Sequence, residues 1–213
     1  GFIGKAVVLG CGYGLGHLKF ASMIYSGMLG AEGVFFDDAM VDLLGADVRG
    51  YSRFISDKPD LLARIVELQP AGLGDVEWLK HVACAFKIIN TFREKNPAIP
   101  TLWKTGDKML RAMYEGTGEK ILMFQTAKDK LLLPNGMWLH SKELELSKDG
   151  DFSCLRRKEG RIQRVKMYGG KVVENLCQAL AGAYVKEAMV RMYLKGHRTI
   201  LQVHDEVVAL APK

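Results

Sequence analysis

The sequence lacks several features that would assign it to a class at once. No apolar run approaches the roughly 20 residues that cross a bilayer, and the chain does not open with a signal-peptide pattern. Cysteine is scarce, and its four residues lie far apart without the paired spacing of a zinc knuckle: Cys11, Cys84, Cys154 and Cys177. We therefore expect no membrane span, a reducing compartment and no zinc knuckle.

Acidic residues are outnumbered by basic ones, 24 against 30, so the formal net charge is +6. This excess suits a polyanionic partner, although it carries no information about the fold. Hydrophobic residues make up 48% of the 213 positions, which is enough for one domain or two small ones.

The strongest local pattern lies at residues 200–210. Apolar residues run into His204, Asp205 and Glu206 and run out again, which predicts a buried β-hairpin with two adjacent carboxylates at its tip. Adjacent carboxylates repel each other, and a hard cation such as Mg²⁺ would neutralise them. The alternative is an ordinary turn with solvated acids.

The first 16 residues combine a helical pattern with glycines at positions 10, 12, 14 and 16. Lys5, Leu9 and Tyr13 recur every four residues, so on a helix they share one face. The glycines argue against a long helix and indicate a close approach to the backbone. A dinucleotide-binding turn is the rival interpretation, but Leu15 and His17 stand where its third glycine belongs.

Further elements follow from start and stop signals. Helices are predicted over 18–29, 59–68, 76–93, 100–114 and 171–194. Asp75 is the expected N-cap of the third of these helices. We interpret Asp37, Asp38 and Asp42 as acids at a helix start rather than as metal ligands.

Strands are predicted after a turn at 115–118, which is the candidate boundary between two parts of the chain. Asn135-Gly136 predicts a hairpin within 131–139. Residues 156–171 carry one acid, Glu159, and seven cations: Arg156, Arg157, Lys158, Arg161, Arg164, Lys166 and Lys171. This run is either a solvated strand surface or a surface that contacts phosphates without reading sequence.

Three motifs, in this order, resemble the family A DNA polymerases of the bacterial polymerase I type, most of all the phage and prophage branch. Lys5-x-x-x-Leu9-Gly10-x-x-Tyr13-Gly14 resembles motif B, on the fingers helix that receives the incoming nucleotide. The segment 168–179, with Tyr-Gly-Gly-Lys and then Glu-Asn-x-x-Gln-Ala, resembles a second family stretch. Gln202-Val203-His204-Asp205-Glu206 resembles motif C of the palm.

The resemblance spans the chain and implies an α+β fold from a right-hand polymerase. Residues 1–115 would be helical fingers, and residues 116–213 the fingers/palm junction and part of an antiparallel-sheet palm. The implied function is template-directed DNA synthesis, in which a primer 3′-hydroxyl attacks a dNTP with the help of two Mg²⁺ ions. The implied partners are primer–template DNA, dNTPs and the remainder of the polymerase, with no membrane, in the cytoplasm of a bacterium or a phage-infected cell.

The resemblance also implies residue roles. Asp205 would be the catalytic metal ligand and Glu206 a weaker or water-mediated participant, while Lys5, Leu9 and Tyr13 would bind the dNTP. The implied primer–template contacts are Gly14, Gln178, His204, Arg161, Arg164 and Lys171.

The sequence departs from the family pattern at several places. Gly1 stands where the family has an arginine, and Met137 replaces the arginine of the family's L-P-S-G-R segment. Asn175 precedes Gln178 by three residues, where many members have four. Nothing resembles the D-x-S-x-x-E-x-R segment of motif A, so we expect the chain alone not to polymerise. Two other functions stay open: a non-catalytic, basic nucleic-acid-binding module and a metal-dependent phosphohydrolase.

Overall fold

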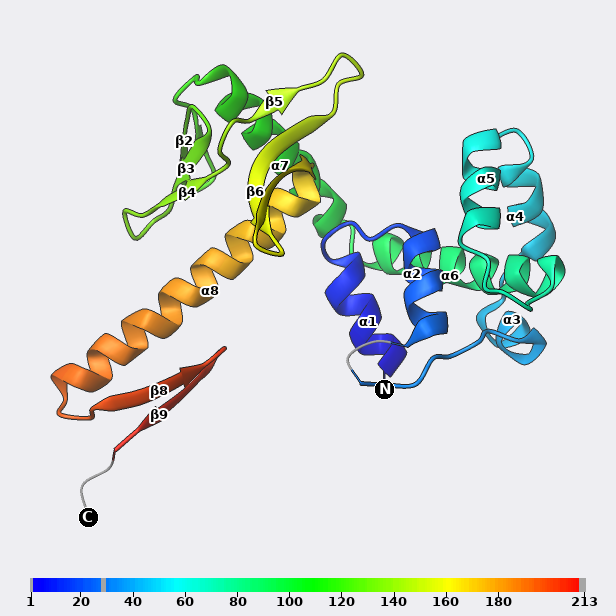
Figure 1. Ribbon diagram of the computed structural model, residues 1–213, viewed down its shortest axis with the longest axis horizontal. Helices are drawn as coiled ribbons and strands as arrows, with labels where there is room; N and C mark the ends of the chain where they lie inside the picture. The colour runs from blue at the N-terminus through cyan, green and yellow to red at the C-terminus, as the bar shows by residue number, and fades with distance from the viewer. Residues whose placement is uncertain (1, 28–29, 211–213) are drawn as a thin grey trace. The chain divides into compact units, whose positions relative to one another are not determined.

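The computed structural model describes residues 2–27 and 30–210, which form two compact units, 1–101 and 102–213 (Figure 1). The first unit is helical and the second combines two long helices with antiparallel sheets. This mixture confirms the α+β prediction. No helix in the described ranges is long and apolar enough to cross a membrane.

The first unit is built around its longest helix, α6. Its helices are α1 (Phe2–Cys11), α2 (His17–Ser26), α3 (Asp38–Leu44), α4 (Val48–Ile55), α5 (Pro59–Glu67) and α6 (Asp75–Lys95). Helices α1, α2, α3 and α4 all contact α6, while α5 packs on α4. Buried residues of α1, α2 and α4 thereby share one apolar core with those of α6.

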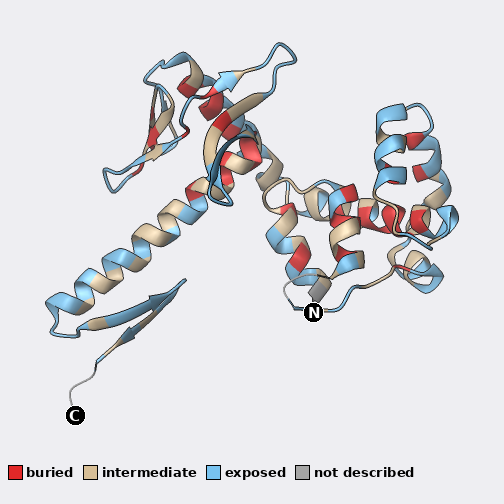
Figure 2. Ribbon diagram, viewed as in Figure 1, coloured by how far each residue is buried: buried red, intermediate tan, exposed pale blue. Residues whose placement is uncertain are grey.

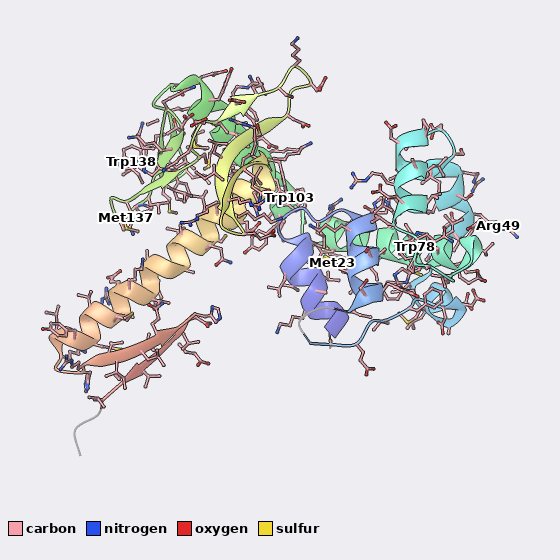
Figure 3. All side chains as sticks on the ribbon, viewed as in Figure 1. Met23, Arg49, Trp78, Trp103, Met137 and Trp138 are labelled. Atoms are coloured by element: carbon pink, nitrogen blue, oxygen red, sulfur yellow. The ribbon has the colours of Figure 1, made fainter. Side chains whose placement is uncertain are left out.

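A core rich in aromatic side chains stabilises this unit, and Trp78, labelled in Figure 3, belongs to it. His81 stacks on Trp78 and on Phe36, with ring centroids 5.3 and 4.8 Å apart. The Nδ1 atom of His81 accepts a hydrogen bond from the Phe36 amide, so Nε2 carries the proton and donates to the Ala21 carbonyl, both at 3.0 Å. Burial lowers the pKa of His81, which is therefore neutral in the core.

Several predicted boundaries in this unit are confirmed and others shift. Asp37 caps α3 by accepting the Met40 amide at 3.0 Å, as expected of an acid at a helix start. Helix α6 begins at Asp75 itself, with Gly74 as N-cap, so Asp75 is a first-turn acid rather than the predicted cap. Helix α2 ends at Ser26, short of the predicted end at residue 29, and residues 28–29 lie outside the described residues.

The second unit starts within α7 (Ala98–Glu115) and contains three antiparallel sheets. The first sheet has β1 (Lys120–Ile121), β2 (Phe124–Ala127), β3 (Lys130–Leu132) and β4 (Trp138–His140) in sequence order. The second has β5 (Glu145–Leu146), β6 (Phe152–Lys158) and β7 (Arg161–Met167). Helix α8 (Gly169–Leu194) then leads to the two-stranded sheet of β8 (Thr199–Val203) and β9 (Glu206–Ala209).

The core of this unit joins α7, the first two sheets and the start of α8. Met109 and Leu110 of α7 pack with Leu131 of β3 and Leu176 of α8. This packing places the start of the compact unit at Leu102, although the change from helix to strand falls after Glu115 as predicted.

Two glycines allow α7 and α8 to approach closely. A Cβ atom added to Gly169 would strike the Trp103 carbonyl, and one added to Gly106 would strike the Gly169 carbonyl. The Asp107 carboxylate accepts the Gly169 amide at the start of α8. The predicted hairpin at Asn135-Gly136 is also present, between β3 and β4.

The final hairpin is not buried, which contradicts the prediction. Beyond Leu176 no described residue is buried, and Figure 2 shows the rest of α8 and both last strands without buried positions. The two strands pair with each other and lie along α8 (Figure 1). The apolar residues of these strands are of a kind usually buried, but within the described chain most of them are exposed to solvent.

Candidate functional site

The acidic tip of the last hairpin is a two-residue turn. Val203 pairs with Glu206, which leaves His204 and Asp205 as the loop. His204 takes a positive φ of 54°, and its carbonyl accepts a 3.0 Å hydrogen bond from the Gln202 side chain. Because the tip is a turn, strand alternation does not force the carboxylates of Asp205 and Glu206 onto opposite faces. Both residues are exposed.

The tip faces α8 across a groove of about 380 Å³. Its lining brings together Gln178, His204 and Asp205, three residues that the sequence motifs single out from segments far apart in the chain. Sequence reasoning missed the rest of the lining: Ala181, Gly182 and Val185. Their helical spacing with Gln178 was the available signal, because positions three and four apart share a helix face.

The carboxylates near this groove do not by themselves form a two-ion metal centre. Among the described residues, no group of three or more His, Cys, Asp or Glu side chains is placed to hold a metal ion. Asp205 and Glu206 come from one hairpin, whereas a two-ion centre needs carboxylates that converge on both ions. The donor set in this part of the chain therefore does not fit two Mg²⁺ ions.

The motif near the N-terminus is only partly helical. Helix α1 ends at Cys11, so Tyr13 lies in the following turn. The prediction that Tyr13 shares a helix face with Lys5 and Leu9 is therefore wrong. The turn closes with a 3.2 Å hydrogen bond from the Leu15 amide to the Gly10 carbonyl. Lys5 and Leu9 are exposed, while Tyr13 and Gly14 are half-buried in the turn. Gly1 lies outside the described residues.

A partly buried cluster around Arg93 and His17 supports this turn from inside. Arg93 of α6 donates a 3.1 Å hydrogen bond to the Leu15 carbonyl, and His17 lies 2.8 Å from the Tyr51 hydroxyl. Burial, with a smaller contribution from Arg93, lowers the pKa of His17 to about 4. Burial raises the pKa of Cys11 to about 11, so its thiol is protonated and unreactive at neutral pH.

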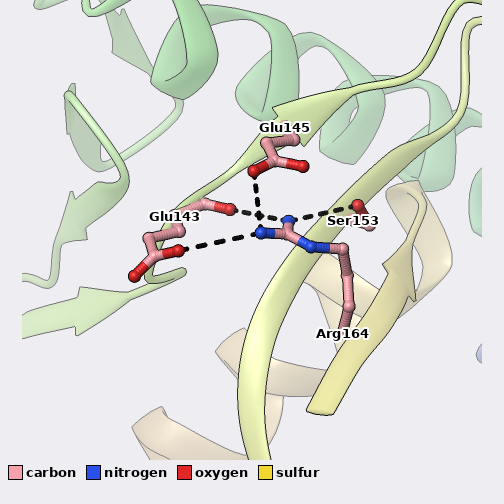
Figure 4. A network of polar contacts seen from close by, with 4 residues as sticks. All are labelled: Glu143, Glu145, Ser153 and Arg164. Atoms are coloured by element: carbon pink, nitrogen blue, oxygen red, sulfur yellow. Dashed lines mark hydrogen bonds and ion pairs between the residues drawn. The ribbon is translucent and has the colours of Figure 1, made fainter. Parts of the chain in front are cut away.

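The basic run lies mainly on the β6–β7 hairpin, and the fold pairs much of it. Arg164 donates to the Glu143 carbonyl at 3.0 Å, the Glu145 carboxylate at 2.8 Å and the Ser153 hydroxyl at 3.4 Å (Figure 4). The Glu143 carboxylate lies 3.8 Å from the same guanidinium. The charge of Arg164 is thus balanced by acids that precede the run in sequence.

Other cations of the run are also engaged. Lys171 contacts Glu174 at 2.8 Å, and Arg156 donates to the Asn175 side chain at 3.2 Å. Arg157 and Arg161, in contrast, have no ion-pair partner among the described residues, and both are exposed. The part of the run that is available to an outside anion is therefore narrower than the sequence indicated.

Two candidate positions from the family pattern can also be located. Gln178 is exposed on α8 at the groove, and Met137 is exposed beside Trp138 at the β3–β4 turn (Figure 3). Met137 presents a thioether where the family pattern has a guanidinium, so this turn lacks that cation.

Comparison with known proteins finds a short similarity to a polymerase. A 54-residue segment is 39% identical to a DNA polymerase of Bacillus phage SP02, which covers 25% of this chain and 8% of that protein. No family model matches the chain, and no solved structure matches it. The chain is thus related to a DNA polymerase over about a quarter of its length.

Proposed function

We propose that this chain is part of a family A DNA polymerase that carries out template-directed DNA synthesis. The observation that carries the proposal is the groove between α8 and the last hairpin, where Gln178, His204 and Asp205 meet. The family resemblance assigns Gln178 to the primer–template, His204 to the primer terminus and Asp205 to the catalytic carboxylate. The segment shared with the phage polymerase supports the same conclusion.

In this proposal residues 1–115 contribute the fingers, and residues 116–213 contribute the fingers/palm junction and part of the palm. Lys5 offers a point charge suited to a triphosphate, and Leu9 lies one turn further along the exposed face of α1. Tyr13, in the turn that follows, would complete the dNTP site beside the templating pair, and Gly14 would contact the primer–template. The whole polymerase would act on primer–template DNA and dNTPs.

Asp205 is the residue that we propose as a Mg²⁺ ligand, with Glu206 beside it. The further carboxylates of a two-ion centre would come from the remainder of the polymerase, because the described residues supply a single acidic hairpin. We therefore expect the 213-residue chain to show no primer extension by itself. Metal-dependent elongation by this chain, lost in Asp205→Asn, would contradict that expectation.

Arg157 and Arg161 are the cations of the β6–β7 hairpin that we propose to contact DNA phosphates. Both are exposed and unpaired within the described ranges, whereas Arg164 is held by Glu145. Contacts of this kind position a duplex without reading its sequence, which suits an enzyme that copies any template.

The test is primer extension by the full-length polymerase with Asp205→Asn. We expect extension to be lost while primer–template affinity is retained, because the carboxylate serves the metal and the cations hold the phosphates. Asp60→Asn, on an exposed position of α5, is the matched control and should extend primers like the wild type. Extension by Asp205→Asn within tenfold of the wild type would exclude the proposed role.

A non-catalytic DNA-binding module is the second candidate, favoured by the exposed arginines on β6 and β7. It would bind primer–template DNA with the same affinity whether or not Asp205 is intact, and the full-length protein would not extend a primer. Release of phosphate or nucleotides without a primer would instead indicate a phosphohydrolase.

A further inference from the structure

A basic pocket lies on α7 and shares no lining residue with the groove at the hairpin tip, although Tyr168, the first residue of the 168–179 motif, is part of its wall. It has a volume of about 400 Å³ and is lined by α7, the β5–β6 turn and the end of β7. The charged residues in its wall are Lys104, Asp107, Lys108, Arg111, Asp151 and Lys166. The proposed function uses none of them.

Three of the cations stand on one face of α7. Lys104, Lys108 and Arg111 follow at helical spacings of four and three residues, so their side chains project together. All three are exposed, and Lys166 joins them from β7. Like charges four residues apart destabilise a helix slightly, so nothing in helix formation itself accounts for this arrangement.

The two carboxylates of the pocket are already engaged. Asp107 accepts the Gly169 amide, and Asp151 contacts Lys166 at 2.7 Å. Lys104 and Lys108 have no partner among the residues that the structure describes. The pocket therefore holds four cations against two carboxylates, and neither lysine of α7 is ion-paired within the described residues.

Arg111 is oriented toward the same pocket by an aromatic ring. Its guanidinium lies 5.4 Å from the centroid of the half-buried Phe152 ring, a cation–π contact that leaves the donors at its edge available. Its nearest carboxylate is Glu115, at 3.9 Å, which is long for a charge-assisted hydrogen bond.

We propose that this pocket binds a phosphate group, either of a DNA strand or of a free nucleotide. Lysine and arginine donors form charge-assisted hydrogen bonds with phosphate oxygens, and the volume lies within the range of small-ligand pockets. The proposal rests on the proposed function only in naming DNA as one source of the phosphate. It predicts a phosphate contact separate from those of Arg157 and Arg161.

The experiment compares the wild-type chain with Lys104→Gln/Lys108→Gln and a charge-matched control, Lys19→Gln/Lys95→Gln, from exposed positions in the first unit. Binding of a labelled primer–template is measured by fluorescence anisotropy over a range of salt concentrations. Binding of inorganic pyrophosphate and of dATP is measured by calorimetry. Circular dichroism melting checks that the substitutions, at exposed helical positions, leave the fold intact.

If the phosphate belongs to DNA, the pocket variant should lose about 0.9 from the slope of log affinity against log salt, or about eightfold in affinity at 0.1 M salt for one phosphate contact. If it belongs to a free nucleotide, the variant should lose pyrophosphate and dATP binding while DNA binding stays unchanged. Effects equal to those of the control on every ligand would overturn the proposal.

The phosphate pocket and the DNA interface of the proposed function can be excluded separately. Loss of DNA binding in Arg157→Gln/Arg161→Gln, with the pocket variant unaffected in its binding of DNA, pyrophosphate and dATP, would retain the β6–β7 interface and exclude the pocket. A wild-type chain that binds pyrophosphate through Lys104 and Lys108 but does not bind DNA would retain the pocket and contradict the DNA interface.

Discussion

Trp78 in the helical unit is 1% exposed, whereas Leu201 and Val203 in the last hairpin are 54% and 47% exposed. The first unit encloses Trp78, Phe20 and Phe36, and both ring nitrogens of the buried His81 are hydrogen-bonded. The hairpin carries comparably apolar residues but has only strand pairing and a narrow contact with α8. Since a two-stranded hairpin is marginally stable by itself, the residues of greatest functional interest lie on the least stabilised part of the described chain.

The two regions should differ most in how much folding stability is lost when an apolar side chain is removed. Trp78→Ala should destabilise the helical unit by about 3–5 kcal/mol, because it empties a closed core and leaves the Ile65 carbonyl without its 2.8 Å donor. Leu201→Ala should change stability by less than about 0.5 kcal/mol. Urea unfolding followed by circular dichroism measures the free energy of unfolding of both variants. Equal losses of stability would show that the two regions do not differ in packing.

Acid should distinguish the same two regions, because the helical unit buries neutral histidines. The pKa of His17 falls from an ordinary 6.5 to about 4, and burial lowers that of His81 as well. The unfolded chain therefore binds more protons below pH 6.5, and stability present above that value is lost as the pH falls toward 4.

Each histidine should contribute a loss of at most about 1.4 kcal/mol per pH unit in that window. Unfolding free energies measured by urea titration at several pH values test this. His17→Gln should reduce the pH dependence, while the exposed His140→Gln, in the second unit, should leave it unchanged. Identical pH profiles for the wild type and His17→Gln would show that His17 is not buried neutral.

A third prediction concerns the close contact between α7 and α8. It compares the buried start of α8 with the part of the same helix that has open space around it. Gly169→Ala should cost about 1–3 kcal/mol, since its Cβ would overlap the Trp103 carbonyl and the Asp107 carboxylate. Gly182→Ala, on the same helix with open space around its Cβ, should instead stabilise the helix by up to about 1 kcal/mol. Thermal melting of the two variants separates the buried start of α8 from its exposed remainder.

The smallest expected effect concerns the cations of β6 and β7. Arg164→Gln should lower stability by less than about 1 kcal/mol, because its ion pairs with Glu143 and Glu145 are largely exposed. Arg161→Gln should reduce the salt slope of DNA binding by about 0.9, and Arg164→Gln should reduce it by less. Equal slopes for the two variants would show that the ion pairs with Glu143 and Glu145 do not prevent Arg164 from contacting DNA.

Local signals in the sequence predicted much of the secondary structure. The N-cap of α3 at Asp37, the hairpin at Asn135-Gly136 and the course of α8 each follow from a cap, a turn or a helical stripe within a few residues. The same locality explains the errors. Periodicity alone extended the face of Lys5 and Leu9 to Tyr13, although the turn bonded to the Gly10 carbonyl ends the helix before it.

The sequence by itself determined most of the elements, because capping, turn chemistry and hydrophobic spacing act between near neighbours. The resemblance of its motifs to a polymerase family implied the α+β class and the candidate site residues. Only the tertiary structure decided which cations Glu143, Glu145 and Asp151 neutralise, and that Gln178 meets Asp205 across one groove. It also decided that the last hairpin lies exposed within the described residues. These outcomes depend on contacts between segments far apart in the chain. A local sequence pattern does not determine which distant side chain makes such a contact, or whether any does.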